Sequence, residues 1–430
     1  MKTLLKNAKI LSMKDDHIAT GDVVIEDERI IYVGLDSAKY GPFDIVRDIK
    51  GNLLMPTFKN AHTHSAMTFL RSKTDDFNLQ DWLFKVVFPR EEHLTEDYVY
   101  KFAKVAYLEC LTSGVSVCFD QYFFPLASKK AAEEIGMRIV LLGVYNSLYG
   151  KEDLKKFYHD INKENGLARY HFGIHAEYTC PDSELEIMNE IIHEEKAPFF
   201  THISETEKEV KECYEKRGMS PVKFLASKGL YDFGGGGYHC CHFNDEDIEI
   251  FKKYHLSVVT CPGSNTKLAS GIAPICKYLE NGINVAIGTD GPASNNSLDM
   301  FKEMTLLYAL QKVTLKDPTA LPAFEILKMA TVNGAKAMGL KDMDYLEAGQ
   351  YADIMEIDLH RPNMQPINNI VNNIVYSGSK ENIKMTMING RILYADGEFH
   401  LKESIDKIYE ECQQATLEIE SLYEKAQQSK

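Results

Sequence analysis

Between residues 57 and 351, short apolar runs alternate with longer segments of helical period. Each apolar run has the length of a buried strand, whereas segments such as 96–114 and 209–229 repeat their apolar residues at helical spacing. Eight such runs occur, at residues 57–62, 114–123, 138–146, 170–178, 198–205, 237–243, 256–265 and 284–292. Eight alternating strand and helix units predict an α/β fold, a (β/α)8 barrel of the TIM type, for residues 57–351.

The two ends of the chain have a different pattern, with short alternating strands and turn residues. Because these segments flank the barrel, we expect residues 1–56 and 352–400 to form one small β-sandwich domain into which the barrel is inserted. Residues 401–430 have the pattern of a terminal amphipathic helix. Turns are predicted at Gly21-Asp22, Gly34 and Asn389-Gly390.

Composition narrows the class of protein. A chain of 430 residues accommodates a barrel and a smaller domain. The first residues lack an apolar stretch of signal-peptide length, and no segment approaches the roughly 20 apolar residues of a membrane span. Nine cysteines without regular spacing are typical of a reducing compartment, so we expect a cytoplasmic protein.

The charge of the chain bears on its partners. A formal net charge of −15 argues against nucleic acid and against an anionic membrane, both of which would repel the protein. A small-molecule partner is therefore favoured. The sequence does not decide whether the protein forms a homo-oligomer, such as a dimer or tetramer, because no linear pattern shows an apolar patch.

Polar residues fall near the carboxyl ends of the predicted barrel strands, where the chemistry of such barrels takes place. They follow the first, fourth, fifth, sixth and eighth apolar runs and are His62, His64, His175, His202, His239 and Asp290. Because a barrel brings its strand ends to one mouth, we expect these side chains to surround a single site.

Part of this set suits a divalent metal. His62 and His64 are two residues apart, so in a strand both rings face one side and can reach the same ion at about 2.0 to 2.1 Å. With His202 and Asp290 they make a ligand set typical of zinc or another borderline divalent ion, with room for a water. The fourth run has no lysine that could form a carbamate bridge between two metals, so one metal is expected.

Glu205 follows the histidine of the fifth run by three residues, which places a carboxylate near the metal without making it a ligand. That is the position of a proton shuttle. We expect Glu207 and Glu209 to be solvated residues at the start of a helix. His239 is either a further ligand or a group that polarises bound water, and His242 is interpreted as structural.

Other catalytic motifs are excluded or weak. His175-Ala-Glu177 has the H-x-E form of the zinc deaminases that pair it with P-C-x-x-C, but Cys180 and Cys261 precede proline here and no C-x-x-C follows. The four glycines at 234–237 lack the spacing and the lysine of a phosphate-binding loop, so we expect a flexible turn. No G-x-S-x-G nucleophile elbow occurs.

Longer motifs carry a resemblance to a known family. They are NAHTHSAMTFLRS, THISET, CPGSNTKLASGIAPI and GTDGPASNNSLDMFKEM, which begin at residues 60, 201, 261 and 288. The chain resembles the amidohydrolase superfamily over nearly its whole length, and within it the branch of the 5'-methylthioadenosine/S-adenosylhomocysteine deaminases. The resemblance implies one zinc ion held by His62, His64, His202 and Asp290.

The resemblance also implies an activity, the hydrolytic deamination of adenosine-type nucleosides. Asp290 would accept a proton from the attacking water, His239 would help to polarise that water, and Glu205 would give a proton to purine N1. The implied substrates are 5'-methylthioadenosine, 5'-deoxyadenosine, adenosine and S-adenosylhomocysteine.

Four residues stand where the related deaminases contact the nucleoside. Trp82 would form an aromatic wall, Glu91 would bind the ribose hydroxyls, and His175 and Ser294 would lie near the ring or the sugar. Judged by residue type alone, a place in the core is the commoner fate of a single tryptophan.

Two alternatives remain open at this point. One is another aminohydrolase or chlorohydrolase of the same branch, acting on guanine, a pterin or an s-triazine; Glu91 argues for a ribose-bearing substrate instead. The other is a metal-binding scaffold without turnover, against which the combination of Glu205, His239 and Asp290 argues, since metal storage needs no proton shuttle.

One departure from the family pattern concerns S-adenosylhomocysteine. Relatives that accept it carry one arginine after the third strand and another in the following loop, and this chain has Gly143 or Val144 near the position of the first. Lys151 is a candidate for the second arginine, but it offers a point charge in place of a planar fork. We therefore expect substrates without a carboxylate to be preferred.

Overall fold

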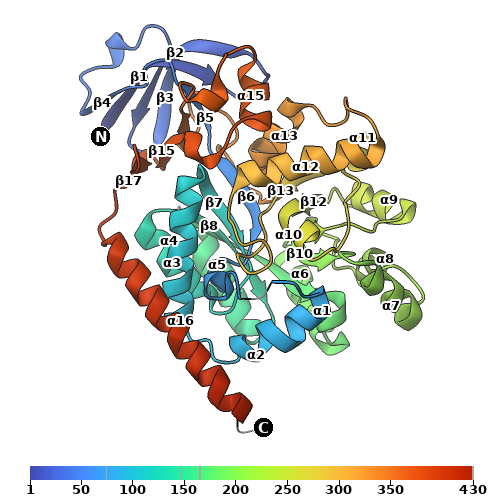
Figure 1. The fold of residues 1–430 in the computed structure, drawn as a ribbon. Coiled ribbons are helices and arrows are strands. Elements are labelled where there is room, and N and C mark those ends of the chain that lie inside the picture. Colours follow the sequence, from blue (N-terminus) through green and yellow to red (C-terminus); the bar gives the residue numbers. More distant parts are fainter. Residues whose placement is uncertain (74, 147, 164–165, 429–430) are drawn as a thin grey trace.

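The computed structural model describes residues 1–73, 75–146, 148–163 and 166–428, and its larger part is a parallel sheet surrounded by helices (Figure 1). The eight strands follow one another in chain order, and each pairs with the next in parallel. They are β6 (Phe58–Thr63), β7 (Val115–Asp120), β8 (Arg138–Val144), β9 (Ala168–Ala176), β10 (Phe199–Ile203), β11 (Gly235–His239), β12 (Ser257–Thr260) and β13 (Asn284–Ile287). The predicted barrel-type α/β fold is confirmed.

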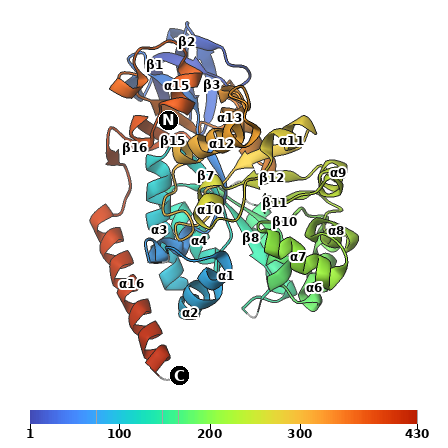
Figure 2. The same cartoon turned by 45° about the vertical axis from the view of Figure 1, so that its right-hand side comes forward.

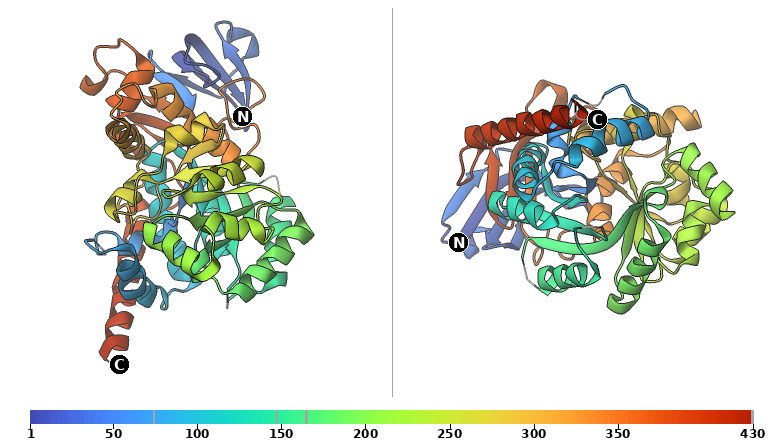
Figure 3. Two further views of the ribbon diagram at one scale, coloured as in Figure 1. Left: turned by 90° about the vertical axis from the view of Figure 1, so that its right-hand side faces the viewer. Right: turned by 90° about the horizontal axis from the view of Figure 1, so that it is seen from below.

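Helices lie outside this sheet, as the view from below shows (Figure 3). They connect successive strands or follow the last one. They are α3 (Glu96–Thr112), α4 (Pro125–Ile135), α5 (Lys151–Lys163), α6 (Asp182–Glu195), α7 (Glu207–Arg217), α8 (Pro221–Ser227), α9 (Asp245–Lys253), α10 (Pro262–Lys267), α11 (Ile275–Glu280), α12 (Met300–Leu315), α13 (Ala323–Ala330) and α14 (Val332–Ala337).

The segment just beyond β13 joins the last strand to the first. The amide N–H of Asp290 donates to the carbonyl oxygen of His62 at 3.0 Å, and the amide N–H of Thr289 donates to Asn60 Oδ1 at 2.9 Å. The barrel is thereby held together at the carboxyl end of its strands. The same contacts bring two of the predicted metal ligands side by side.

Strands from both ends of the chain form a second sheet, in the order β17-β16-β15-β14-β5-β1-β2-β3, with β4 also paired to β1. Their bounds are β1 (Lys2–Leu11), β2 (Ile18–Glu26), β3 (Arg29–Gly34), β4 (Ile45–Asp48), β5 (Leu53–Pro56), β14 (Ile354–Ile357), β15 (Ile383–Ile388), β16 (Arg391–Ala395) and β17 (Glu398–Phe399). All nine strands belong to one hydrogen-bonded sheet, in which the N- and C-terminal strands share an apolar core that includes Val23 and Met385.

The turn predictions for these strands have mixed outcomes. Asn389 and Gly390 have φ values of 52° and 73° and join β15 to β16, as an Asn-Gly hairpin requires. Gly34 ends β3, as predicted. The prediction for Gly21-Asp22 is wrong, because both lie inside β2; a Cβ at Gly21 would come within 2.8 Å of the Gly34 carbonyl oxygen, so this glycine permits a close approach of two strands.

The glycine run at 234–237 also differs from the prediction of a flexible turn. Gly235 to Gly237 are the first residues of β11. A Cβ at Gly235 would lie 1.9 Å from the carbonyl oxygen of Phe199, and one at Gly236 would lie 2.4 Å from that of Ser257. The glycines are needed because neighbouring backbone atoms leave no room for side chains.

The chain ends in a long helix, α16 (Ile405–Gln428), on the outside of the barrel. The predicted helix extended to residue 430, and residues 429–430 lie outside the described part. Further short helices are α15 (Ile370–Tyr376) and those between residues 79 and 91. Among the described residues, no helix has both the length and the apolar character needed to cross a membrane.

Candidate metal centre and active site

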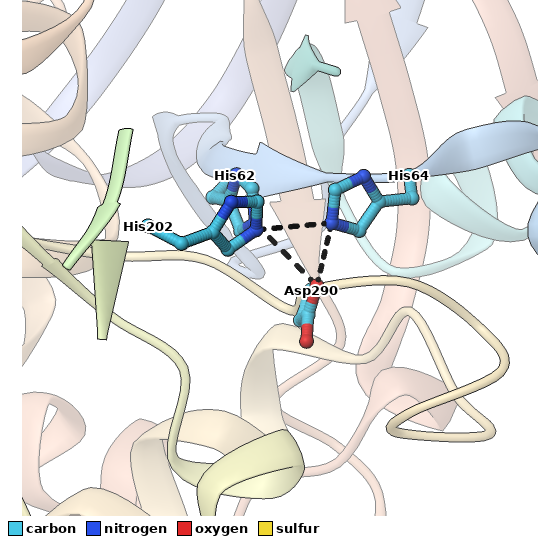
Figure 4. A group of neighbouring side chains, drawn as sticks. All are labelled: His62, His64, His202 and Asp290. Atoms are coloured by element: carbon cyan, nitrogen blue, oxygen red, sulfur yellow. Dashed lines mark hydrogen bonds and ion pairs between the residues drawn. The ribbon is translucent and has the colours of Figure 1, made fainter. Parts of the chain in front are cut away.

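Three histidines and one aspartate from three strand ends converge at the mouth of the barrel (Figure 4). His62 lies in β6 and His64 just after it, His202 lies in β10, and Asp290 follows β13. One ligand atom from each of these residues lies within 4.8 Å of those of the others, and all four side chains are buried. The arrangement predicted from the strand ends is thus present.

Backbone carbonyl groups orient two of the imidazoles. His64 Nδ1 is 2.6 Å from the carbonyl oxygen of Gln121, and His202 Nδ1 is 2.6 Å from that of His175. If each Nδ1 carries the proton it donates, each Nε2 keeps a free lone pair, and the two Nε2 atoms lie 3.3 Å apart. Such a support fixes ring orientation and tautomer for metal binding.

The ring nitrogens of His62 and one oxygen of Asp290, Oδ1, have no hydrogen-bond partner among the described residues. All three atoms are buried. Burial lowers the pKa of His62 to about 3, so its imidazole is neutral and able to donate a lone pair. Buried polar atoms of this kind are costly when unsatisfied. A divalent cation between the imidazoles and the carboxylate satisfies them.

Asp290 divides its two oxygens between the cluster and two hydroxyl groups. Oδ1 lies 3.2 Å from His64 Nε2 and 3.4 Å from His62 Nε2. Oδ2 accepts hydrogen bonds from Ser264 at 2.6 Å and from Ser294 at 2.7 Å. Asp290 has a φ of 58°, in the left-handed region that non-glycine residues avoid, which is a form of strain found at functional sites.

Glu205 and His239 face each other next to the cluster. Glu205 Oε2 is 3.8 Å from His239 Nε2, and Glu205 Oε1 accepts a hydrogen bond from Ser270 at 2.7 Å. His239 Nδ1 is 2.7 Å from Asn265 Oδ1, so a proton on Nδ1 leaves Nε2 directed at the site. His239 lies outside the four-residue ligand cluster.

Apart from Ser294, the side chains that support Asp290, Glu205 and His239 come from one segment to which the sequence analysis assigned no role. Ser264, Asn265 and Ser270 all lie in the motif CPGSNTKLASGIAPI, which follows β12. The signal that could have identified them is a cluster of short polar side chains directly after a barrel strand. His242 is structural, as expected, because its Nε2 is 2.7 Å from the carbonyl oxygen of Ser270.

The prediction that Glu209 is solvated is wrong. Thr206 caps α7 by accepting a hydrogen bond from the amide of Glu209, and this first turn places the Glu209 side chain inside the protein. Its two oxygens accept hydrogen bonds from the amide N–H groups of Ser204 at 2.6 Å and Glu205 at 2.8 Å. Burial raises the pKa of Glu209 to about 7. Glu209 therefore fixes the backbone that carries Glu205.

We expect Glu209→Gln to weaken this support, because a carboxamide has one acceptor oxygen for two amide donors. Near pH 4, where the Glu209 carboxyl is protonated in the folded and in the unfolded chain, the comparison isolates the lost acceptor, and the free energy of unfolding should fall by about 1–3 kcal/mol. Urea unfolding measures the loss, with the exposed Glu207→Gln as a matched control. A Glu209→Gln protein as stable as the control would contradict this role.

A cavity of about 810 Å³ opens over the cluster. Its lining includes residues of the cluster together with Glu205 and His239. Of the side chains expected to contact a nucleoside, Trp82, Glu91 and His175 also line it. Ser294 is not among the lining residues and is instead bonded to Asp290.

Glu91 is the buried carboxylate on the wall of this cavity. It accepts a hydrogen bond from the Tyr122 hydroxyl at 2.7 Å, and burial raises its pKa to about 7. Trp82, whose side chain is buried, also lines the cavity. At the mouth, Phe84, Phe123 and Leu148 line the cavity and are exposed to solvent.

No lysine or arginine within the described ranges lines the cavity. Val144, at the end of β8, does line it. Lys151 does not; it is ion-paired with Glu190 at 2.9 Å and Glu194 at 2.7 Å on α6. The suggestion that Lys151 replaces a substrate-binding arginine is therefore not supported by its position.

Comparison with known proteins places this chain among hydrolases. Residues 53–393 match the model of the Amidohydrolase family. A 5-methylthioadenosine/S-adenosylhomocysteine deaminase of Thermoanaerobacter pseudethanolicus is 39% identical, with 93% of this chain and 95% of the relative covered. A 5'-deoxyadenosine deaminase of Methanosarcina mazei is 37% identical, with 97% and 98% covered.

Solved structures share the fold of this chain. The structure of an adenosine deaminase from Xanthomonas campestris with bound zinc is similar with a TM-score of 0.91 and 26% identity, over 97% of this chain and 98% of that one. A guanine deaminase from C. acetobutylicum shares the fold, with a TM-score of 0.80 and 19% identity over 92% and 100% of the two chains. The chain belongs to the amidohydrolase family.

Proposed function

We propose that this protein is a metal-dependent deaminase that converts adenosine-type nucleosides and water to the inosine-type product and ammonia. The observation that carries the proposal is one cavity that combines the His/His/His/Asp cluster, the adjacent Glu205 and, on another wall, the buried Glu91. Relatives that are 36–39% identical over almost the whole chain are named as deaminases of such nucleosides.

One zinc ion per chain is the metal we propose for the cluster. Three imidazoles and one carboxylate are a ligand set that zinc accepts, and the similar Xanthomonas campestris structure contains zinc. When bound, the ion supplies a Lewis acid that lowers the pKa of a bound water to about 7.

The residues of the chain then move the protons. Asp290, whose Oδ2 is held by Ser264 and Ser294, takes a proton from the water that adds to C6 of the purine. Glu205 gives a proton to N1, which makes C6 more electrophilic. His239, with Nε2 directed at the site, helps to polarise the water. The proton held by Asp290 passes to the amino group, the C6–N bond breaks and ammonia leaves, while the C6 hydroxyl returns a proton to Glu205 as the carbonyl forms.

The remaining polar residues position the nucleoside. We propose that Glu91 accepts hydrogen bonds from the two vicinal ribose hydroxyls, for which a carboxylate is well suited. Trp82 would pack against the face of the substrate. His175, with Nδ1 2.9 Å from Thr179 Oγ1, is held at the cavity wall. Ser294 acts through Asp290 in this proposal, because its hydroxyl is already bonded to that carboxylate.

The mouth of the cavity favours an uncharged 5' group. With C6 at the cluster and the ribose at Glu91, the 5' substituent extends towards the exposed Phe84, Phe123 and Leu148. A carboxylate there would lose hydration and meet no cation among the described lining residues. An unsatisfied group of this kind costs about 1–3 kcal/mol.

We therefore expect kcat/KM for 5'-methylthioadenosine to exceed that for S-adenosylhomocysteine by about 10- to 100-fold, since 1.4 kcal/mol corresponds to a factor of ten. Steady-state ammonia release measures both values. Val144→Arg places a cation at the cavity wall and should reduce the ratio of the two kcat/KM values. Val144→Met is the control for side-chain size. A ratio near one in the wild-type protein would contradict the account of the mouth.

The proposed function itself is tested by ammonia release from a substrate panel. The zinc-loaded protein should deaminate 5'-methylthioadenosine, 5'-deoxyadenosine or adenosine, and should leave guanine and an s-triazine unchanged. Turnover of guanine or the triazine alone would contradict the proposal and show that the substrate is a free base or a triazine. No turnover of any compound by protein with bound metal would favour a non-catalytic metal protein.

A further inference from the structure

A short stretch of irregular helix forms one wall of the cavity. We call residues 79–94 the wall segment. It comprises α1 (Leu79–Asp81), the π-helical η3 (Trp82–Val87), α2 (Phe88–Glu91) and the residues that follow. Trp82, Phe88 and Glu91 of this segment line the cavity. The wall segment belongs to neither sheet, so its position depends on what lies behind it.

The helix α16 lies behind the wall segment. It runs down the outside of the barrel beside α3, and its end extends beyond the rest of the chain (Figures 1 and 2). Of its 24 residues only Ile408, Ala415 and Ile419 are buried. Ile405 and Cys412 also pack against the core, and the helix makes polar contacts besides.

Two residues of α16, Glu420 and Tyr423, contact Arg90 of the wall segment. Arg90 Nε donates to Glu420 Oε1 at 3.0 Å, and its guanidinium carbon lies 4.0 Å from the centre of the Tyr423 ring. Arg90 also donates to the carbonyl oxygen of Val86 at 2.9 Å, which braces η3. Lys73 lies 3.2 Å from the same Glu420 oxygen.

This network differs from an ordinary surface ion pair, which contributes little because water screens it. The side chains of Arg90 and Glu420 are 14% and 19% exposed. Burial would raise the pKa of Glu420, but the hydrogen bonds from Arg90 and Lys73 lower it, so the carboxylate stays ionised. A cation over an aromatic ring adds to the attraction.

Arg90 and Glu91 are consecutive in α2 and make contacts on different sides. Arg90 bonds to α16, whereas Glu91 bonds to Tyr122 at the cavity. We propose that Glu420 and Tyr423 are positioning residues: α16 holds Arg90, and through it sets Glu91 and Trp82 against the nucleoside. This inference rests on the proposed function for its effect on substrate, but not for its effect on the wall segment.

The proposal predicts an effect on binding that is separate from the chemical step. Glu420→Gln and Tyr423→Leu should each raise KM for 5'-methylthioadenosine by about 5- to 30-fold while kcat changes by less than about twofold, because the lost interaction acts equally in the ground and transition states. Glu424→Gln, an exposed change one turn further along α16, is the matched control and should leave both constants unchanged.

A second measurement does not depend on turnover. Trp82 is the single tryptophan of the chain and lies in the wall segment, so its fluorescence reports on that segment alone. At a temperature where circular dichroism shows each variant folded, Glu420→Gln should shift the emission to longer wavelength and increase quenching by acrylamide. Glu424→Gln should match the wild-type protein.

The two measurements separate the possible failures. A changed Trp82 emission with no turnover of any nucleoside by the wild-type protein would support the link between α16 and the wall segment and reject the proposed function. Wild-type emission and KM in both Glu420→Gln and Tyr423→Leu would overturn the inference. A lowered melting temperature with unchanged emission and KM would also overturn it, since α16 would then act on stability alone.

Discussion

Replacing Glu205 with glutamine should lower kcat for nucleoside deamination by about 10²- to 10⁴-fold, the range that a positioned acid or base contributes. The side chain keeps its shape and its contact with Ser270, but loses the proton that the purine nitrogen needs. Zinc should still bind, because Glu205 is not part of the ligand cluster. The loss should therefore appear in kcat and not in metal content.

Ammonia release and metal analysis on the same preparation test this expectation. Glu207→Gln changes an exposed residue two positions away and serves as the control. If Glu205→Gln retained wild-type turnover, Glu205 would not be the acid. If it lost its zinc as well, the residue would have to be a ligand.

Removing a metal ligand should abolish activity entirely. In His62→Ala, one of the three imidazoles is lost and the remaining ligands face an open space, so we expect zinc content far below one per chain and no detectable ammonia. Chelation of the wild-type protein should have the same effect, and added zinc should restore activity. His193→Ala, an exposed histidine paired with Asp232, is the control.

Stability offers a readout of this site that is independent of catalysis. A ligand that binds only the folded state at a hundred times its Kd raises the free energy of unfolding by about 2.7 kcal/mol. Zinc should therefore raise the melting temperature of the wild-type protein and of Glu205→Gln, but not that of His62→Ala. An equal rise in His62→Ala would show that the ion binds elsewhere.

The sequence allowed the barrel and the ligand cluster to be predicted for a physical reason. A parallel barrel imposes a rule, because every strand delivers its last residues to the same mouth. His62, His202 and Asp290 lie at the ends of strands that are far apart in the chain, yet the rule alone brings them together. The Asn389-Gly390 turn was predictable on similar grounds, since few residue pairs adopt its backbone conformation readily.

Other features depend on contacts that no local pattern encodes. Glu209 has the sequence context of a solvated helix start, and only the fold shows that its carboxylate binds two buried amides. Gly21 and Gly235 look like turn residues until the neighbouring strands are in place and leave no room for a side chain. The ion pairs of Lys151 depend on a second helix, and so does the link from Arg90 to Glu420.

The central claim is that the protein deaminates adenosine-type nucleosides, and the most direct test is the ultraviolet spectrum of a reaction. Zinc-loaded protein is mixed with 5'-methylthioadenosine or 5'-deoxyadenosine, with Glu205→Gln protein as the blank. The account predicts conversion of the adenine to the hypoxanthine chromophore with one ammonia released per nucleoside, and little change in the blank. An unchanged adenine spectrum with zinc bound, or equal conversion by the blank, would contradict it.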